Sequence, residues 1–145
     1  MNITIGKITP ERLLQHYKDC NMPIAGVNMR KHSEKLCALA TMILVYTADE
    51  NLVGLCACYM NDYNTQTAYI THIAISPQYR GKGYGKQLLE KTIAIAQEHG
   101  FQKLNLEVLK TNLSALSLYQ SHDFTIIEDR NTKYLMSLHL ADKSG

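Results

Sequence analysis

Seven consecutive residues combine three glycines with three cationic side chains. The segment reads Arg80-Gly81-Lys82-Gly83-Tyr84-Gly85-Lys86. It follows an apolar, β-branched run at 70–75, which predicts a buried strand, and it leads into a helical pattern that extends to about residue 99. Free backbone N–H groups and the positive end of a helix dipole would then face the same anion. This arrangement predicts a pyrophosphate-binding site.

Two common phosphate-binding loops do not fit the spacing. A P-loop requires a glycine, four residues and then Gly-Lys-Ser/Thr, but Lys86 is followed by Gln87. The dinucleotide pattern G-x-G-x-x-G fails as well, because Gly85 comes one residue too early. What remains is Arg-x-x-Gly-x-Gly after a strand and a proline, with a flexible surface turn as the alternative interpretation.

The composition favours one globular domain over residues 1–145. The chain is 46% hydrophobic and 19% charged, which is enough apolar material for a packed core. A net charge of +2 is too small to indicate nucleic-acid binding. The sequence shows no signal segment and no apolar run of the roughly 20 residues that a membrane span requires. We therefore expect a cytoplasmic protein without membrane contact.

The four cysteines predict buried thiols. Cys56 and Cys58 stand two apart in a predicted strand, so their side chains share one face and are poorly placed to bond each other. A Cys-x-Cys metal pair needs further ligands at close spacing, and none follows. We expect reduced cysteines, no metal and a reducing compartment.

The remaining pattern predicts a mixed α/β fold with about seven mostly antiparallel strands and about four helices. Strands are expected at 2–8, 41–47, 52–60, 67–75, 103–109, 124–128 and 133–140. Helices are expected from residue 10, with Thr9 as N-cap, and at 29–38, 84–99 and 113–122. Residues 21–28 read as a loop. Because a helix connects the strands at 67–75 and 103–109, these two strands should be parallel.

Together with residues downstream, the glycine loop resembles the acetyl-CoA-binding motif of the GNAT superfamily of N-acetyltransferases. That family carries Arg/Gln-x-x-Gly-x-Gly/Ala after an apolar strand and a proline. Its second element is matched in order by Glu107, Asn112 and Tyr119. The glycine that usually precedes the last phenylalanine is replaced by Asp123, a residue type that tolerates the left-handed backbone.

The resemblance implies a GNAT-like fold whose central parallel strands separate after a bulge and receive acetyl-CoA as co-substrate. Loop N–H groups would hold the pyrophosphate, and strand residues would pair with the pantetheine arm and polarise the thioester. The implied cofactor-binding residues are Ile73, Ala74, Ile75, Arg80, Gly81, Lys82, Gly83, Tyr84, Gly85, Lys86 and Asn112.

Three residues are candidates for acid and base. A lysine-type amine has a pKa of about 10.4, so its deprotonation at pH 7 costs roughly 4–5 kcal/mol and a base is useful. Glu107 matches the base of relatives that acetylate protein N-termini. His72 on the cofactor strand is its rival, and relayed water is the third choice. Tyr119 is the expected general acid for the leaving thiolate.

The sequence thus predicts acetyl transfer from acetyl-CoA to a primary amine by direct attack in a ternary complex. The acceptor is left open between a small molecule, such as an amino sugar, and a protein N-terminus. A non-catalytic acyl-CoA-binding module of the same fold is the alternative, and acyl-chain preference and a homodimer are also left open. Nucleic-acid binding is a third interpretation, which the weak net charge disfavours.

Overall fold

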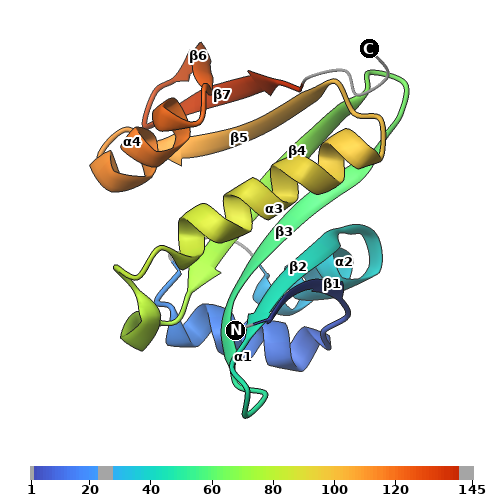
Figure 1. The fold of residues 1–145 in the computed structure, drawn as a ribbon, viewed down its shortest axis with the longest axis vertical. Coiled ribbons are helices and arrows are strands. Elements are labelled where there is room, and N and C mark those ends of the chain that lie inside the picture. Colours follow the sequence, from blue (N-terminus) through green and yellow to red (C-terminus); the bar gives the residue numbers. More distant parts are fainter. Residues whose placement is uncertain (1, 23–27, 141–145) are drawn as a thin grey trace.

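The computed structural model describes residues 2–22 and 28–140. Within them, one sheet has the strand order β1-β2-β3-β4-β5-β7-β6, with helices on both faces (Figure 1). The strands are β1 (Asn2–Gly6), β2 (Thr41–Tyr46), β3 (Leu52–Asp62), β4 (Thr67–Ile75), β5 (Lys103–Leu109), β6 (Thr125–Arg130) and β7 (Lys133–His139). The helices are α1 (Pro10–Asp19), α2 (Met29–Leu39), α3 (Tyr84–Glu98) and α4 (Leu113–Ser121), with a short 3₁₀ turn η1 (Pro77–Tyr79).

The predicted mixed α/β fold is confirmed. β4 and β5 are parallel, and the other neighbouring strands are antiparallel. Predicted strand ends lie within two residues of the observed ones. Most of the loop predicted at 21–28 lies outside the described residues. None of the described helices is long and apolar enough to cross a bilayer.

Two apolar clusters, one on each face of the sheet, hold the helices in place. In β2, Ile43 and Val45 face α3, whereas Met42 and Leu44 face α1 and α2. A strand covered on both faces reads as a continuous apolar run, which explains the pattern at 41–46. Each fully buried leucine contributes about 1.5–3 kcal/mol. Packing on both faces therefore stabilises the sheet, and the sheet can hold the side chains of a site in fixed positions.

The cysteines are free and largely buried, as predicted. Cys56 and Cys58 lie in the cluster under α3 and are 0% exposed. Burial raises the pKa of Cys56 to about 12. An acyl-cysteine route through these thiols has no support, because they have no solvent access.

A bulge in β4 determines which side chains face which helices. Thr71 is an extra residue against β3, where the register shifts. Consequently Ile70 and Ile73 both belong to the α3 cluster, and His72 points to the opposite face, where α1 and α2 lie.

At the same point β4 and β5 separate. Their parallel register runs from Thr67 and Lys103 to Ile70 and Leu106, and then ends. Beyond it the two strands diverge, with β5 running toward α4 and β4 toward the start of α3 (Figure 1). Among the described residues, the last five of β4 therefore have no strand partner on their β5 side, and a strand-like ligand can pair there.

Candidate active site

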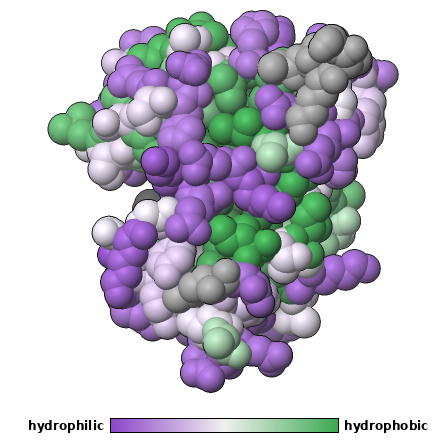
Figure 2. Space-filling view, viewed as in Figure 1, coloured by the Kyte–Doolittle hydropathy of each residue, from purple (hydrophilic) through white to green (hydrophobic). Residues whose placement is uncertain are grey.

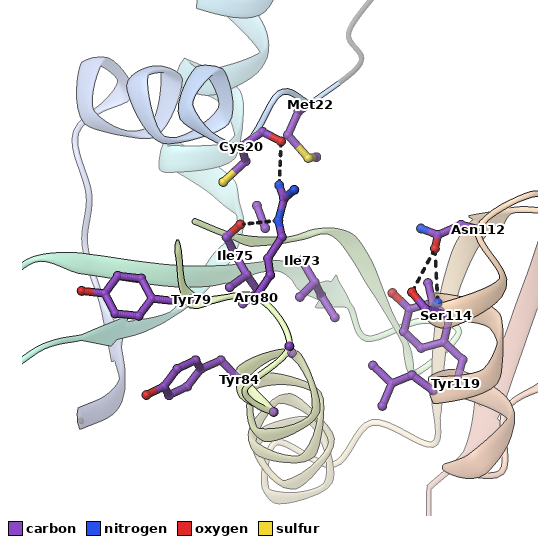
Figure 3. A pocket seen from close by; sticks show the side chains of 16 residues that line it. Cys20, Met22, Ile73, Ile75, Tyr79, Arg80, Tyr84, Asn112, Ser114 and Tyr119 are labelled. Carbon is purple, nitrogen blue, oxygen red and sulfur yellow. Dashed lines mark hydrogen bonds between the residues drawn. The ribbon is translucent and has the colours of Figure 1, made fainter. Parts of the chain in front are cut away.

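A cleft of about 370 Å³ opens where β4 and β5 separate. The end of β4, the glycine loop and the start of α3 form one wall, and α4 forms the other (Figure 3). On the surface it is a notch between the lobe with α4 and the lobe with the α3 N-terminus (Figure 2). The predicted site residues that line it are Ile73, Ala74, Ile75, Arg80, Gly81, Gly83, Tyr84, Gly85, Asn112 and Tyr119. Lys82, Lys86, Glu107 and His72 do not line it.

The glycine loop leaves its backbone N–H groups available. Gly81 and Gly83 have φ angles of 75° and 86°, a left-handed region that favours glycine. Gly83 is the N-cap of α3 and supplies no side-chain cap. Among the described residues, no group accepts a hydrogen bond from the N–H groups of residues 81–86. An anion at this helix end would meet unpaired donors and the positive end of the dipole.

Arg80 braces the loop against α1. Its Nε donates to the Ile75 carbonyl at 3.1 Å, and its Nη2 donates to the Cys20 carbonyl at 2.9 Å, at the C-terminal end of α1 (Figure 3). Sequence reasoning found Arg80 but missed this partner, which lies sixty residues earlier in the chain. The guanidinium therefore supports the cleft chiefly by fixing the loop.

Tyr119 points from α4 into the cleft toward Ile73 of β4 (Figure 3). Its ring packs against Phe124, with centroids 5.8 Å apart. Burial, with a smaller contribution from Cys56, raises the pKa of Tyr119 to about 12. The hydroxyl group is therefore protonated at neutral pH and is able to donate a hydrogen bond into the cleft.

Both ends of α4 are fixed, which positions Tyr119. Asn112 Oδ1 accepts a hydrogen bond from the Ala115 N–H at 3.2 Å, as an N-cap does. At the other end Asp123 has a φ of 70°, the left-handed conformation predicted for it. The side-chain nitrogen of Asn112, Nδ2, has no hydrogen-bond partner among the described residues. Asn112 lines the cleft.

Glu107 lies on the α1–α2 face of the sheet, where its carboxylate accepts a hydrogen bond and forms an ion pair. Tyr69 Oη donates to Glu107 Oε1 at 3.0 Å, and Arg130 Nη1 is 3.5 Å from Oε2. Burial, and then the bond to Glu107, raise the pKa of Tyr69. An acceptor ammonium that used this carboxylate would compete with Arg130. Sequence reasoning did not identify Tyr69 or Arg130 as partners.

His72 lies on the same face as Glu107. Its ring packs on Tyr17, with centroids 5.0 Å apart, and its Nε2 is 3.1 Å from His32 Nε2. Burial first, and then His32 and Lys133, lower the pKa of His72 to about 4. His72 is therefore neutral at pH 7 and able to accept a hydrogen bond.

We expect the lowered pKa of His72 to make the fold sensitive to acid. The unfolded chain binds this proton near pH 6.5 and the folded protein only near pH 4, so stability falls as pH drops through that window. The expected loss between pH 7 and pH 4.5 is on the order of 2 kcal/mol. Urea unfolding at the two pH values measures it, and His72→Gln should remove that part of the loss. An equal loss in the variant would contradict the assignment.

The separated β4 and β5 strands, the glycine loop and the start of α3 together form an open cleft with an exposed strand edge and, in the described part of the chain, unpaired helix N–H groups. Residues 11–124 match the model of the acetyltransferase (GNAT) family, and the chain belongs to this family. The predicted resemblance is confirmed.

The relatives agree with this fold. The ribosomal protein bS18-alanine N-acetyltransferase of Haemophilus ducreyi is 32% identical over 93 residues, which cover 64% of this chain and 62% of that protein. N-alpha-acetyltransferase 50 of Danio rerio is 28% identical over 135 residues, which cover 91% and 80%. A solved structure, the PaiA N-acetyltransferase of Thermoplasma acidophilum in complex with coenzyme A, has a TM-score of 0.76 at 19% identity and covers 96% and 99%. The match with the Haemophilus protein spans less than two thirds of that relative.

Proposed function

We propose that this protein transfers an acetyl group from acetyl-CoA to a primary amine. One observation carries the proposal: unpaired loop N–H groups, the free edge of β4 and the Tyr119 hydroxyl all meet in one cleft. The pyrophosphate would lie at the start of α3 and the pantetheine arm along residues 73–75. A protein with the same fold has been solved in complex with coenzyme A, which supports coenzyme A as the ligand class.

The residues of the cleft are suited to direct attack of the amine on the thioester in a ternary complex. The neutral amine attacks the thioester carbonyl, and a backbone N–H on the free edge of β4 stabilises the developing oxyanion. As the C–N bond forms and the C–S bond breaks, Tyr119 protonates the departing sulfur. The amine must lose its ammonium proton first, for which Glu107, His72 and relayed water are the candidates.

Within this function we propose a monoamine acceptor of low basicity, such as a peptide N-terminus or an amino sugar. Arg130 pairs with Glu107 and with Glu128, so the Glu107 carboxylate is already occupied and is not free to hold the second ammonium of a polyamine. Lys133 also acts on His72 as a positive charge and lowers its pKa. A peptide α-amine has a pKa of about 7.7–8.0, so its deprotonation at pH 7 costs only about 1 kcal/mol. The Haemophilus relative is named as an N-acetyltransferase of an alanine in ribosomal protein bS18, and the Danio relative as an N-alpha-acetyltransferase. Both names favour the peptide acceptor.

Two measurements test the proposal. Saturating acetyl-CoA should raise the melting temperature by several degrees, since a ligand at about 100 times its Kd adds about 2.7 kcal/mol. Release of free CoA thiol should then be faster with an alanine-initiated peptide or glucosamine than with spermidine. The absence of a thermal shift would refute the cofactor site. A shift without turnover on any amine would indicate a non-catalytic binding module.

A further inference from the structure

We propose that His32 and His72 form a two-histidine relay that takes a proton from the acceptor ammonium and passes it to solvent. The inference rests on the proposed acetyl transfer and adds a route for deprotonating the acceptor. The relay joins α2 to β4, on the sheet face that carries α1 and α2.

The geometry of the pair limits it to one shared hydrogen. The two Nε2 atoms are 3.1 Å apart, and the rings are nearly perpendicular at 89°. At this distance one nitrogen donates and the other accepts. Two N–H groups facing each other would repel, so the pair can take up only one additional proton. Neither Nδ1 atom has a hydrogen-bond partner among the described residues, and each ring therefore keeps one nitrogen for exchange.

His72, the inner end of the relay, adjoins the cofactor cleft along β4 without lining it. It directly precedes Ile73, which lines the cofactor cleft, and the bulge at Thr71 turns its side chain to the α1–α2 face. Tyr17, 1% exposed, closes one side of the ring. His32, in the first turn of α2, forms the outer end.

The surrounding charges favour release of the proton. Lys35 on α2 lowers the pKa of His32, and Lys133 on β7 lowers the pKa of His72. The phenol of Tyr17 on α1 packs on His72, and Tyr59 on β3 lies near Tyr17. Among the described residues no carboxylate forms an ion pair with either ring. Burial is the main cause of the lowered pKa of both histidines. A captured proton is therefore not held in place by a counter-ion.

The proton balance of the relay is complete. His72 Nδ1 takes one proton from the acceptor ammonium, and its Nε2 proton moves to Nε2 of His32. His32 then gives its Nδ1 proton to water, and the neutral amine attacks the thioester. After the C–N bond forms, the second amine proton passes to water. The thiolate receives its proton from Tyr119, and the Tyr119 phenolate is then reprotonated from water. The pair returns to its neutral state when both tautomers reset through solvent.

The test is the pH profile of kcat/KM for His32→Gln, between pH 6 and 9.5, with an α-amine peptide as acceptor. We expect about a ten-fold loss at pH 6.5, which disappears near pH 9.5, where bulk water has already deprotonated the amine. The KM for acetyl-CoA should stay unchanged. His139→Gln, an exposed histidine on β7, is the matched control and should follow the wild type.

The outcomes separate the relay from the acetyl transfer itself. A His32→Gln profile that is parallel to the wild type, whether lower or equal, overturns the relay because only packing is then affected. Wild-type inactivity toward every amine overturns the proposed function instead. Histidine NMR titration of the wild type provides a second, activity-independent test: the two rings should gain a single proton in a coupled step. Independent titration of the rings overturns the relay.

Discussion

Replacing Tyr119 with phenylalanine should lower kcat about 100-fold while changing the Kd for acetyl-CoA by less than about two-fold. The hydroxyl points into the cleft toward Ile73, and burial keeps it protonated. Phenylalanine retains the packing on Phe124 but cannot donate a proton to the thiolate. Single-turnover kinetics at saturating acetyl-CoA and calorimetric titration with CoA measure the two quantities.

Tyr63→Phe is the matched control, because it removes the same atom from a side chain that is 63% exposed and packs on Phe101, outside the cleft. It should leave both quantities at wild-type values. Normal turnover in Tyr119→Phe would show that the thiolate leaves unaided, and it would remove Tyr119 from the mechanism. Equal losses in turnover and in CoA affinity would assign Tyr119 to binding instead.

The sequence predicted those parts of the site that depend on local chemistry. The glycine loop and the left-handed Asp123 each lie within a few residues of the element that they shape, so composition and spacing were sufficient.

The long-range partners were not predictable from spacing. His32 meets His72 across forty residues, and Arg80 reaches the Cys20 carbonyl across sixty. Each contact depends on how α1 and α2 pack on the sheet. The residue pattern within a helix does not indicate which residues of the sheet it will contact. The surroundings of the candidate base are a further example, because the partners of Glu107, namely Tyr69 and Arg130, were not indicated by the spacing.

Changing Gly85 to aspartate should weaken the binding of coenzyme A without destabilising the fold. Gly85 is in the first turn of α3, has no left-handed φ, and a Cβ there would meet no atom within 4 Å. A carboxylate in a first helical turn stabilises the helix dipole by about 0.3–1 kcal/mol, and replacing a helical glycine adds a gain of similar size. The melting temperature should therefore stay equal or rise.

The same carboxylate would occupy the N–H groups proposed for the pyrophosphate and repel that group. Loss of two charge-assisted hydrogen bonds, about 3 kcal/mol, predicts a rise in the Kd for CoA of about 100-fold. Gly85→Asn has nearly the same shape without the charge, so it should bind CoA much more tightly than Gly85→Asp, and Gly85→Ala should bind more tightly still. Calorimetry with CoA and thermal unfolding of the three variants give both measurements. If Gly85→Asp and Gly85→Asn bind CoA equally, the anion does not lie at the start of α3, and the glycine loop must act through its shape alone.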